Sequence, residues 1–462
     1  MPTNEAIKEP QLAGKLPELT PEHSSPALTL TAALLGFALI TLDASVVNVA
    51  LPSIGSALGG GLSGLQWVVD AYTLAFAALM LSTGAFSDRA GASRAYALGI
   101  TVFTLASAAC GLAPSLGALV AARVVQGVAA AVVLPASLAL VRQAYTDPAR
   151  RARAVALWAA GGSVAVALGP VAGGALTTAW DWRGIFFINL PLGAVALALL
   201  VRAPRSERRP APLDLPGQLT AVVALTALTF SVIEGGRTGL VAFGVAVAAA
   251  VAFVRTEARQ SHPVVPLGLF RSREVSVAVA TGAAASVAFY GVVFLFSLFF
   301  QQVQGRSALY AGLMFLPMAG LISVTNVLSG KLAGRYGARL PMLLGQGLAA
   351  GGLLALLFVD AGTSPALVAG LLVPMALGCA LTVPPLTAVM LDAVPAERAG
   401  LAAGVLNAAR QVAGGLAIAV FGVLASHGFT AGLRLSLLIS AALFVVTFLL
   451  SCRLAGRPAR QA

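Results

Sequence analysis

The sequence predicts an all-α, polytopic membrane protein, and three observations lead to this prediction. First, 58% of the 462 residues are hydrophobic and only 10% are charged, whereas an ordinary soluble domain carries about 25% charged residues. Second, apolar runs recur along the chain, and many reach the roughly 20 residues that span a bilayer as a helix. Third, Lys and Arg gather in alternate segments between these runs, as cytoplasmic segments do under the positive-inside rule.

Division of the chain at its charged and Pro/Gly-rich breaks gives fourteen candidate spans. They cover residues 28–51, 65–85, 95–113, 115–141, 152–176, 185–202, 216–233, 238–254, 275–300, 309–332, 340–359, 365–391, 399–425 and 431–452. With the N-terminus inside, 23 of the 29 Lys and Arg residues fall on the inner side. The exceptions are Arg183, Arg237, Arg306 and Arg434 outside, and Arg123 and Arg410 within spans. This asymmetry predicts fourteen helices with both termini cytoplasmic, and it accounts for the net charge of +12 without a nucleic-acid partner.

An internal repeat predicts how these spans are grouped. The stretch GAFSDRAGASR at 84–94 follows the second span, and GKLAGRYGAR at 330–339 follows the tenth. If two six-helix halves are related by an axis along the membrane normal, two further helices must lie between them. The predicted parts are a disordered cytoplasmic leader, an N-terminal bundle, two inserted helices with linkers, a C-terminal bundle and a cytoplasmic tail, over residues 1–26, 27–203, 204–274, 275–452 and 453–462.

The first span contains an acidic residue. Asp43 has no other charge within fifteen residues on its N-terminal side. An ionised carboxylate at such a depth costs roughly 2.5–3.5 kcal/mol, so these residues usually face a partner or a water-filled path. We interpret Asp43 as the proton-binding group of a membrane transporter. The alternative is a structural charge that only holds helices together.

Depth relates Asp43 to other polar residues within the spans. Asp43 lies 8 residues below the outer end of its span, and Arg123 lies 8 residues below the outer start of the fourth. At 1.5 Å per residue both are roughly 12 Å deep, so a contact is allowed if the helices adjoin. A carboxylate keeps its charge beside an arginine and tends to lose it when desolvated, so movement between two such surroundings would make Asp43 bind and release a proton. Asp70 is a weaker candidate, because the nearby Trp67 and its depth suggest a hydrated, interfacial position.

Five motifs in chain order resemble the fourteen-helix drug:proton antiporter branch of the major facilitator superfamily, from about Leu28 to Leu450. They are LDASVVNVALP at 42–52, GAFSDRAGASR at 84–94, LVAARVVQG at 119–127, GPVAGG at 169–174 and WRGIFFINLP at 182–191. The resemblance implies the major facilitator fold, two six-helix bundles with two inserted helices. It also implies multidrug efflux, and hence antibiotic resistance, in a bacterial plasma (inner) membrane.

Two of these motifs predict conformational gating. A negative charge is favoured near arginines or a helix N-terminus, so the inner loop is expected to latch the two halves in one conformation through Gly84, Asp88, Arg89, Gly91 and Arg94. Small residues let membrane helices approach closely and proline bends them, so the fifth span is expected to form a bending seal with Gly169, Pro170, Gly173 and Gly174. A solvated turn and plain packing are the respective alternatives.

Polar residues in the spans define the substrate prediction. The candidates for substrate binding are Asn48, Gln126, Asn189, Tyr290, Phe294, Asn326, Asn407, Arg410 and Gln411. Asn407, Arg410 and Gln411 share one helix face. The charged residues singled out within the spans have a formal net charge of zero, because two acids, Asp43 and Asp70, balance two bases, Arg123 and Arg410. That balance leaves room for neutral, zwitterionic or monocationic lipophiles.

Enzymatic function finds no support in the sequence. It contains no phosphate-binding loop with a Lys-Ser/Thr pair, no cluster with metal-ligand spacing and no nucleophile–base arrangement. We therefore expect a proton-coupled antiporter that exports lipophilic drugs or other amphiphilic small molecules, with no cofactor and the proton gradient as energy source. Its partners would be substrate, H⁺ and membrane lipids, and the protein would be a monomer. The alternatives are a dedicated exporter of one endogenous metabolite, such as an antibiotic or siderophore, and a membrane scaffold or lipid-moving protein without proton coupling.

Overall fold

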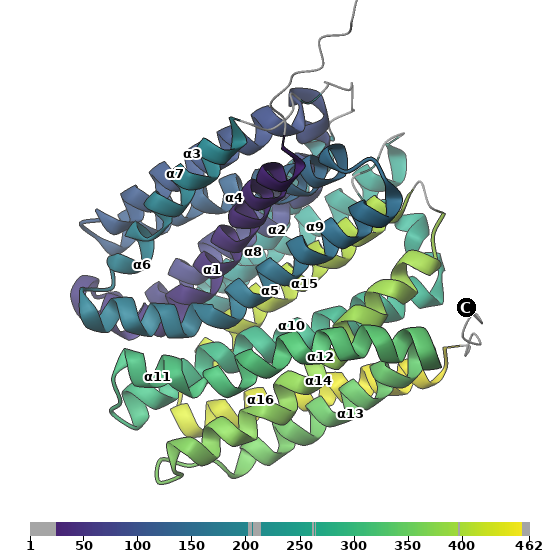
Figure 1. Cartoon of the computed structure of the whole chain (residues 1–462). Coiled ribbons are helices and arrows are strands. Elements are labelled where there is room, and N and C mark those ends of the chain that lie inside the picture. Colours follow the sequence, from purple (N-terminus) through teal and green to yellow (C-terminus); the bar gives the residue numbers. More distant parts are fainter. Residues whose placement is uncertain are drawn as a thin grey trace, which may run out of the picture.

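The computed structural model describes residues 25–201, 206, 214–260, 263, 265–395 and 398–454, and every regular element within them is a helix. The leader up to residue 24 and the tail from residue 455 lie outside this description. In chain order (Figure 1), the helices are α1 Pro26–Leu58, α2 Gly61–Ala90, α3 Ala92–Gly111, α4 Leu116–Ala144, α5 Pro148–Ala179, α6 Gly184–Phe187, α7 Asn189–Leu200, α8 Leu215–Glu234, α9 Gly236–Arg259, η1 Leu267–Arg271, α10 Arg273–Leu298, η2 Phe299–Val303, α11 Ala308–Met314, α12 Leu316–Tyr336, α13 Arg339–Ala355, η3 Leu356–Phe358, α14 Pro365–Asp392, α15 Ala399–Ser426 and α16 Phe429–Cys452.

Within the described part of the chain, thirteen helical segments are long and apolar enough to cross a membrane. Each corresponds to one predicted span. The remaining prediction, 185–202, falls on α6 and α7, a shorter apolar segment that is interrupted at Ile188. Pro191 explains the interruption, because it has no N–H to donate to the carbonyl of Phe187 and its ring crowds that carbonyl. The chain is therefore a multi-pass helical membrane protein, with thirteen rather than fourteen helices that meet this length.

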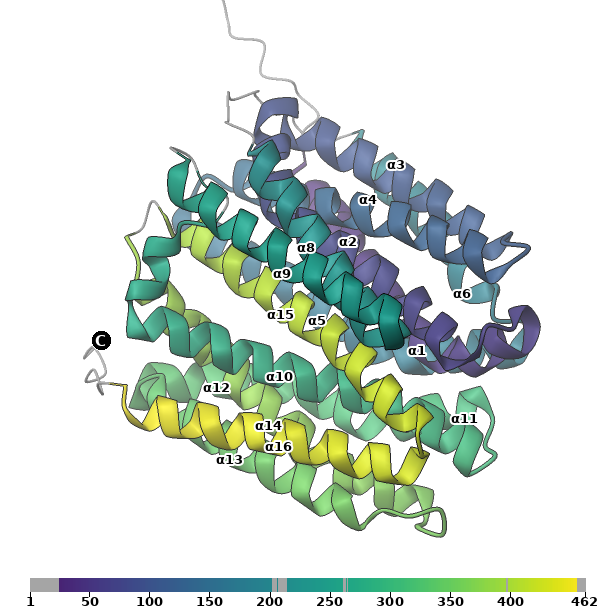
Figure 2. The same ribbon diagram turned by 180° about the vertical axis from the view of Figure 1, so that it is seen from behind.

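The packing of the helices repeats in the two halves of the chain. In the first half α1 packs against α5, and α4 packs against both α2 and α3. In the second half α10 packs against α15, and α14 packs against both α12 and α13. Figures 1 and 2 show these groups as two adjacent bundles. The bundles meet where α2 contacts α15, where α5 contacts α11 and α12, and where α1 contacts α10.

The two repeated loops have the same backbone geometry. Gly91 after α2 and Gly337 after α12 have φ angles of 85° and 80°. An L side chain is strained at such angles, whereas glycine adopts them freely. Gly91 and Gly337 are thus required by the turns that end their helices.

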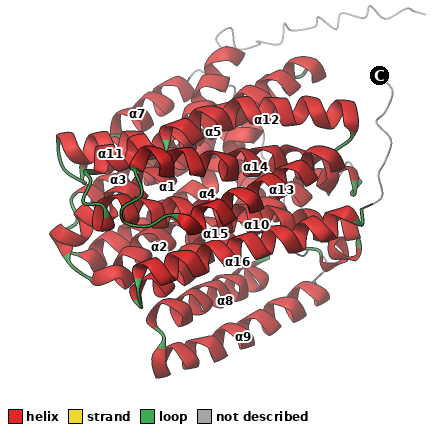
Figure 3. Ribbon diagram, turned by 90° about the horizontal axis from the view of Figure 1, so that it is seen from below, coloured by secondary structure: helices red, strands yellow, loops and turns green. Residues whose placement is uncertain are grey.

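The two inserted helices lie beside the interface between the bundles. Helices α8 and α9 pack against each other, and α8 contacts α2 of one bundle and α15 of the other. They form one edge of the molecule in Figure 3. Glu234 of α8 accepts hydrogen bonds from Ser63 (3.3 Å) and from Trp67 Nε1 (3.2 Å) of α2. The insertion therefore covers a lateral seam between the bundles.

Candidate functional site

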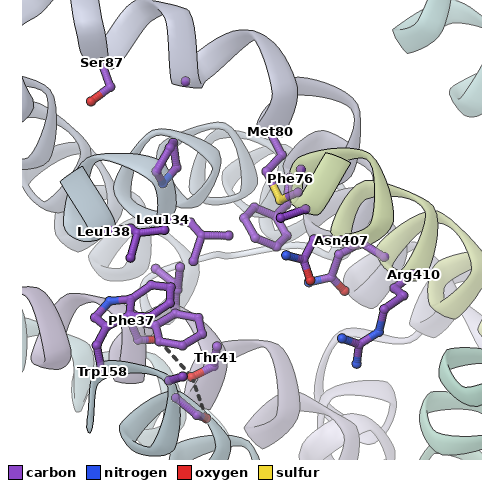
Figure 4. A pocket seen from close by; sticks show the side chains of 18 of the residues that line it. Phe37, Thr41, Phe76, Met80, Ser87, Leu134, Leu138, Trp158, Asn407 and Arg410 are labelled. Atoms are coloured by element: carbon purple, nitrogen blue, oxygen red, sulfur yellow. Dashed lines mark hydrogen bonds between the residues drawn. The ribbon is translucent and has the colours of Figure 1, made fainter. Parts of the chain in front are cut away.

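A cavity of about 1010 Å³ lies between the two bundles (Figure 4). Helices α1, α2, α4 and α5 of the first bundle line it, together with α10, α14 and α15 of the second. Its lining reaches Asp88 near the end of α2, Arg142 near the end of α4 and Asp214 just before α8. The sequence places these helix ends on the inner side of the membrane. The cavity therefore extends to the predicted cytoplasmic face.

The bundles are packed together at the opposite end. Gln66 of α2 donates to the carbonyls of Ile418 (3.1 Å) and Ala419 (2.6 Å) of α15. Gln301 of η2 donates to the carbonyl of Val49 of α1, at 2.9 Å. A buried apolar cluster there includes residues of both bundles. The cavity is therefore closed toward the predicted outer face.

Glycines bring the helices together at this closed end. A Cβ added at Gly174 of α5 would collide with the backbone of Ala308 and Leu309 of α11, and one added at Gly173 would come within 2.5 Å of the carbonyl oxygen of Val46 of α1. Gly169 packs in the same way against Ser45. The predicted role of this motif in close packing is thus confirmed, and its role in motion remains a proposal.

Asp43 lies in a hydrogen-bonded network with no solvent exposure. Its Oδ2 lies 2.5 Å from Arg123 Nη1, and its Oδ1 accepts from Gln126 Nε2 (2.9 Å) and Asn189 Nδ2 (2.8 Å). Arg123 Nε also donates to the carbonyl of Val68, at 3.0 Å. Such additional hydrogen bonds offset part of the cost of removing a charge pair from water, although Arg123 Nη2 has no hydrogen-bond partner among the described residues. The contact expected from the equal depths of Asp43 and Arg123 is confirmed.

The cavity does not reach Asp43 in this conformation. Thr41 and Ala44, its neighbours along α1, line the cavity, whereas Asp43 does not. Tyr72 lines the cavity and its ring centroid lies 4.2 Å from the guanidinium carbon of Arg123. Tyr72 therefore separates the ion pair from the cavity.

Asp70 differs from Asp43 in having no partner. It has no solvent exposure, and neither carboxylate oxygen makes a hydrogen bond with a described residue. The expectation of a hydrated, interfacial Asp70 is therefore wrong, because α15 covers this part of α2. A buried carboxylate without a partner is unfavourable when ionised.

Four predicted substrate residues line the cavity, all from the second bundle: Tyr290, Asn407, Arg410 and Gln411. The other five lie elsewhere. Gln126 and Asn189 belong to the Asp43 network. Phe294 is in the apolar core, Asn326 of α12 is half-buried outside the cavity lining, and Asn48 borders a separate void of only about 10 Å³.

The charged residues of the inner-loop motif at 84–94 are not paired with one another in this structure. Asp88, Arg89 and Arg94 are exposed, and none of the three forms an ion pair with another described residue. Gly84 has open space around its Cα, and Gly91 forms the turn described above. The predicted latch through Asp88 is thus not formed here, consistent with a cavity that is open on this side.

The aromatic wall of the cavity was not predicted. Phe37 of α1 and Trp158 of α5 stack with ring centroids 4.2 Å apart, and Phe76 and Met80 of α2 also line the cavity, nearer to Asn407 (Figure 4). The sequence could have indicated the part of this wall that α1 contributes, because Phe37, Thr41 and Ala44 follow the i, i+4, i+7 spacing of one helix face. The residue of α5 that stacks on Phe37, Trp158, depends on how α1 and α5 pack, and the sequence alone does not indicate it.

The sequence profile of the Major Facilitator Superfamily matches residues 33–418. The chain belongs to this superfamily. Among curated relatives of the chain, the multidrug resistance protein Stp of Mycobacterium tuberculosis is 41% identical over 403 residues, covering 86% of this chain and 75% of Stp. The methylenomycin A resistance protein of Streptomyces coelicolor is 36% identical, and the match covers 94% of this chain and 93% of that protein. The tetracenomycin C resistance and export protein of Streptomyces glaucescens is 32% identical, and the match covers 86% of this chain and 76% of that protein.

Solved transporter structures have a similar fold. A D-xylose–proton symporter matches with a TM-score of 0.69 at 14% identity, covering 94% of this chain and 99% of that one. A bacterial homologue of the human lysosomal transporter Spinster matches with a TM-score of 0.68 at 18% identity (92% and 97%). At these identities the likeness concerns the fold alone. Membership of the superfamily makes this chain a transporter, and its cavity lies at the interface between the bundles.

Proposed function

We propose that this protein is a proton-coupled antiporter that exports lipophilic or amphiphilic drugs across the bacterial plasma membrane, with both termini in the cytoplasm. The single observation that carries the proposal is the cavity of about 1010 Å³ between the bundles, open on one side and closed on the other. Such a volume suits drug-sized ligands, whose pockets measure about 300–1,000 Å³. The names of the relatives as drug resistance and export proteins support efflux as the direction.

The coupling step is assigned to two carboxylates in different surroundings. Asp70 is buried without a hydrogen-bond partner at the contact between α2 and α15, so it would hold a proton while the bundles are closed around it and release it when they separate. Asp43 is held by Arg123, Gln126 and Asn189. It would exchange a proton only in a conformation in which those donors move away. Asp70 is therefore the first candidate for the carrier.

Proteoliposomes with a trapped pH-sensitive dye test this assignment. The wild-type protein should move protons when at least one dye from a panel of neutral, cationic and anionic lipophilic dyes is added. Asp70→Asn should lose this flux by more than tenfold, whereas Asp360→Asn, a change in the exposed loop before α14, should leave it intact. Undiminished flux in Asp70→Asn would remove Asp70 from the mechanism. Absence of flux in wild type with every dye would overturn proton coupling.

A dedicated exporter of one metabolite is the second candidate, supported by the names of two relatives after single compounds, methylenomycin A and tetracenomycin C. Thermal-shift measurements with a chemically broad panel separate the two. A multidrug exporter should be stabilised by many unrelated lipophiles. A specialist should respond to one scaffold and its close analogues.

A further inference from the structure

The second bundle contributes a polar wall to the cavity, and its side chains lack partners. Ser286, Tyr290, Asn407, Arg410 and Gln411 line the cavity. None of these five side chains makes a hydrogen bond or an ion pair with another described residue, and Ser286 Oγ and Arg410 Nε are buried and unpaired. Ser286 is only 2% exposed. Unsatisfied polar groups that converge on a cavity are costly unless something occupies it, so this wall is suited to a polar ligand group.

The fold holds the two largest members of this wall in place. A Cβ at Gly282 of α10 would lie 3.2 Å from Cγ of Arg410, so the absence of a side chain there makes room for the arginine stem. Gly414 of α15 makes room in the same way for the ring of Tyr290, because a Cβ added at Gly414 would lie 2.6 Å from that ring. The guanidinium of Arg410 is thereby positioned at the cavity beside Asn407 (Figure 4).

Arg410 sets the charge of the inner part of the cavity. The other charged lining residues, Asp88, Arg142 and Asp214, lie at the helix ends that form its mouth. Helix α15 begins at Ala399, so at 1.5 Å per residue Arg410 lies roughly 16 Å along it. At 0.15 M salt the Debye length is about 8 Å, and the mouth residues are accordingly screened from Arg410. Asp43 and Arg123 neutralise each other outside the cavity.

We propose, resting on the efflux function above, that the cavity selects amphipathic organic acids, with a carboxylate on Arg410 and a ring system on the aromatic wall. Arg410 can donate two parallel hydrogen bonds to a carboxylate, and Ser286 and Tyr290 can donate to its remaining lone pairs. Across the cavity the stacked Phe37–Trp158 pair forms an apolar surface for a flat body, and Phe76 and Met80 add apolar side chains to the lining between this pair and Asn407 (Figure 4). This differs from the neutral, zwitterionic or monocationic lipophiles that the formal charge balance of the sequence suggests.

Three ligands with one ring body test the proposal: 4-(1-pyrenyl)butanoate, its methyl ester and 4-(1-pyrenyl)butyl-trimethylammonium. Their affinities for the full chain in nanodiscs are measured by energy transfer from tryptophan to pyrene, with empty nanodiscs as the blank. Wild type should bind the carboxylate at least about tenfold more tightly than the ester, as a hydrogen bond to a charged group implies. Equal affinities, or tighter binding of the ammonium compound, would overturn the acid subsite.

Variants identify the residue responsible. Arg410→Gln should abolish the preference for carboxylate over ester while the ester affinity changes less than about twofold, and Arg410→Lys should retain part of it. Arg273→Gln, at the exposed start of α10, removes the same charge outside the cavity and should retain the full preference. If Arg410→Gln does not fold, Ser286→Ala should still weaken carboxylate binding and not ester binding. A preference that survives in both cavity variants would contradict the proposal.

The same ligands separate this proposal from the proposed function. Carboxylate binding without transport driven by a pH gradient in proteoliposomes would leave the subsite standing and refute antiport. Gradient-driven export of the ammonium compound, with weak binding of the carboxylate, would leave antiport standing and refute the subsite.

Discussion

Gly415 of α15 lies directly against Asp70 of α2, and a Cβ added at Gly415 would come 3.5 Å from Asp70 Oδ1 and 3.1 Å from Thr73 Oγ1. Gly415 and Asp70 belong to different bundles. The surroundings of the carboxylate are therefore assembled from both halves, and they persist only while α2 and α15 stay in contact. A relative movement of the bundles changes the hydration of Asp70 without any change in α2 itself, which is the property that a proton carrier in such a transporter requires.

The contact at Gly415 predicts that a small side chain there impairs coupling. Gly415→Ala places a methyl group in a space that is tight against Thr73, so α2 and α15 must separate by a few tenths of an ångström and admit water to Asp70. We expect proton flux per transported substrate to fall in proteoliposomes. Gly347→Ala in α13 is the matched control, because nothing lies within 4 Å of the added Cβ. Unchanged coupling in Gly415→Ala would show that this contact does not control Asp70.

The two buried acids should respond oppositely to neutralisation. Asp43→Asn leaves the Arg123 guanidinium buried without its counter-ion, so the free energy of unfolding should fall by about 3–5 kcal/mol. Asp70→Asn removes a carboxylate that has no partner and should leave stability unchanged or higher. The measurement is denaturant unfolding of the detergent-solubilised protein, followed by tryptophan fluorescence. Destabilisation of Asp70→Asn as large as that of Asp43→Asn would indicate a hidden partner of Asp70.

The closed outer end should open when its glycine packing is disrupted. Gly174→Leu cannot fit against the backbone of α11, so the bundles should separate at the outer face. Ala50 is fully buried at this end of α1. In a background without native cysteines, Ala50→Cys should react with a membrane-impermeant maleimide added outside only when Gly174→Leu is also present. Gly320→Leu in α12, which has open space, is the control, and equal labelling in both backgrounds would contradict the prediction.

Much of the helix pattern follows from sequence alone, because spanning a bilayer requires long apolar runs whatever the packing. Thirteen helices lie where the apolar runs predict them, and the repeated loops at Gly91 and Gly337 share their geometry. The Asp43–Arg123 contact was also predictable, since depth in a helix depends only on residue count. The sixth predicted span, 185–202, is instead divided into α6 and α7 at Ile188, because Pro191 interrupts the helix.

The composition of the cavity was decided by the tertiary structure. Distance along a helix indicates how deep a residue lies, but which way it faces depends on the helix packed against it. Asn189 and Gln126 therefore satisfy Asp43 instead of meeting substrate, and Asp70 is covered by α15 instead of water. The amino-acid sequence by itself determined a repeated membrane bundle with buried charges at matching depth. Only the packing of the two bundles decided which of those charges are neutralised and which, like Arg410, remain available at the cavity.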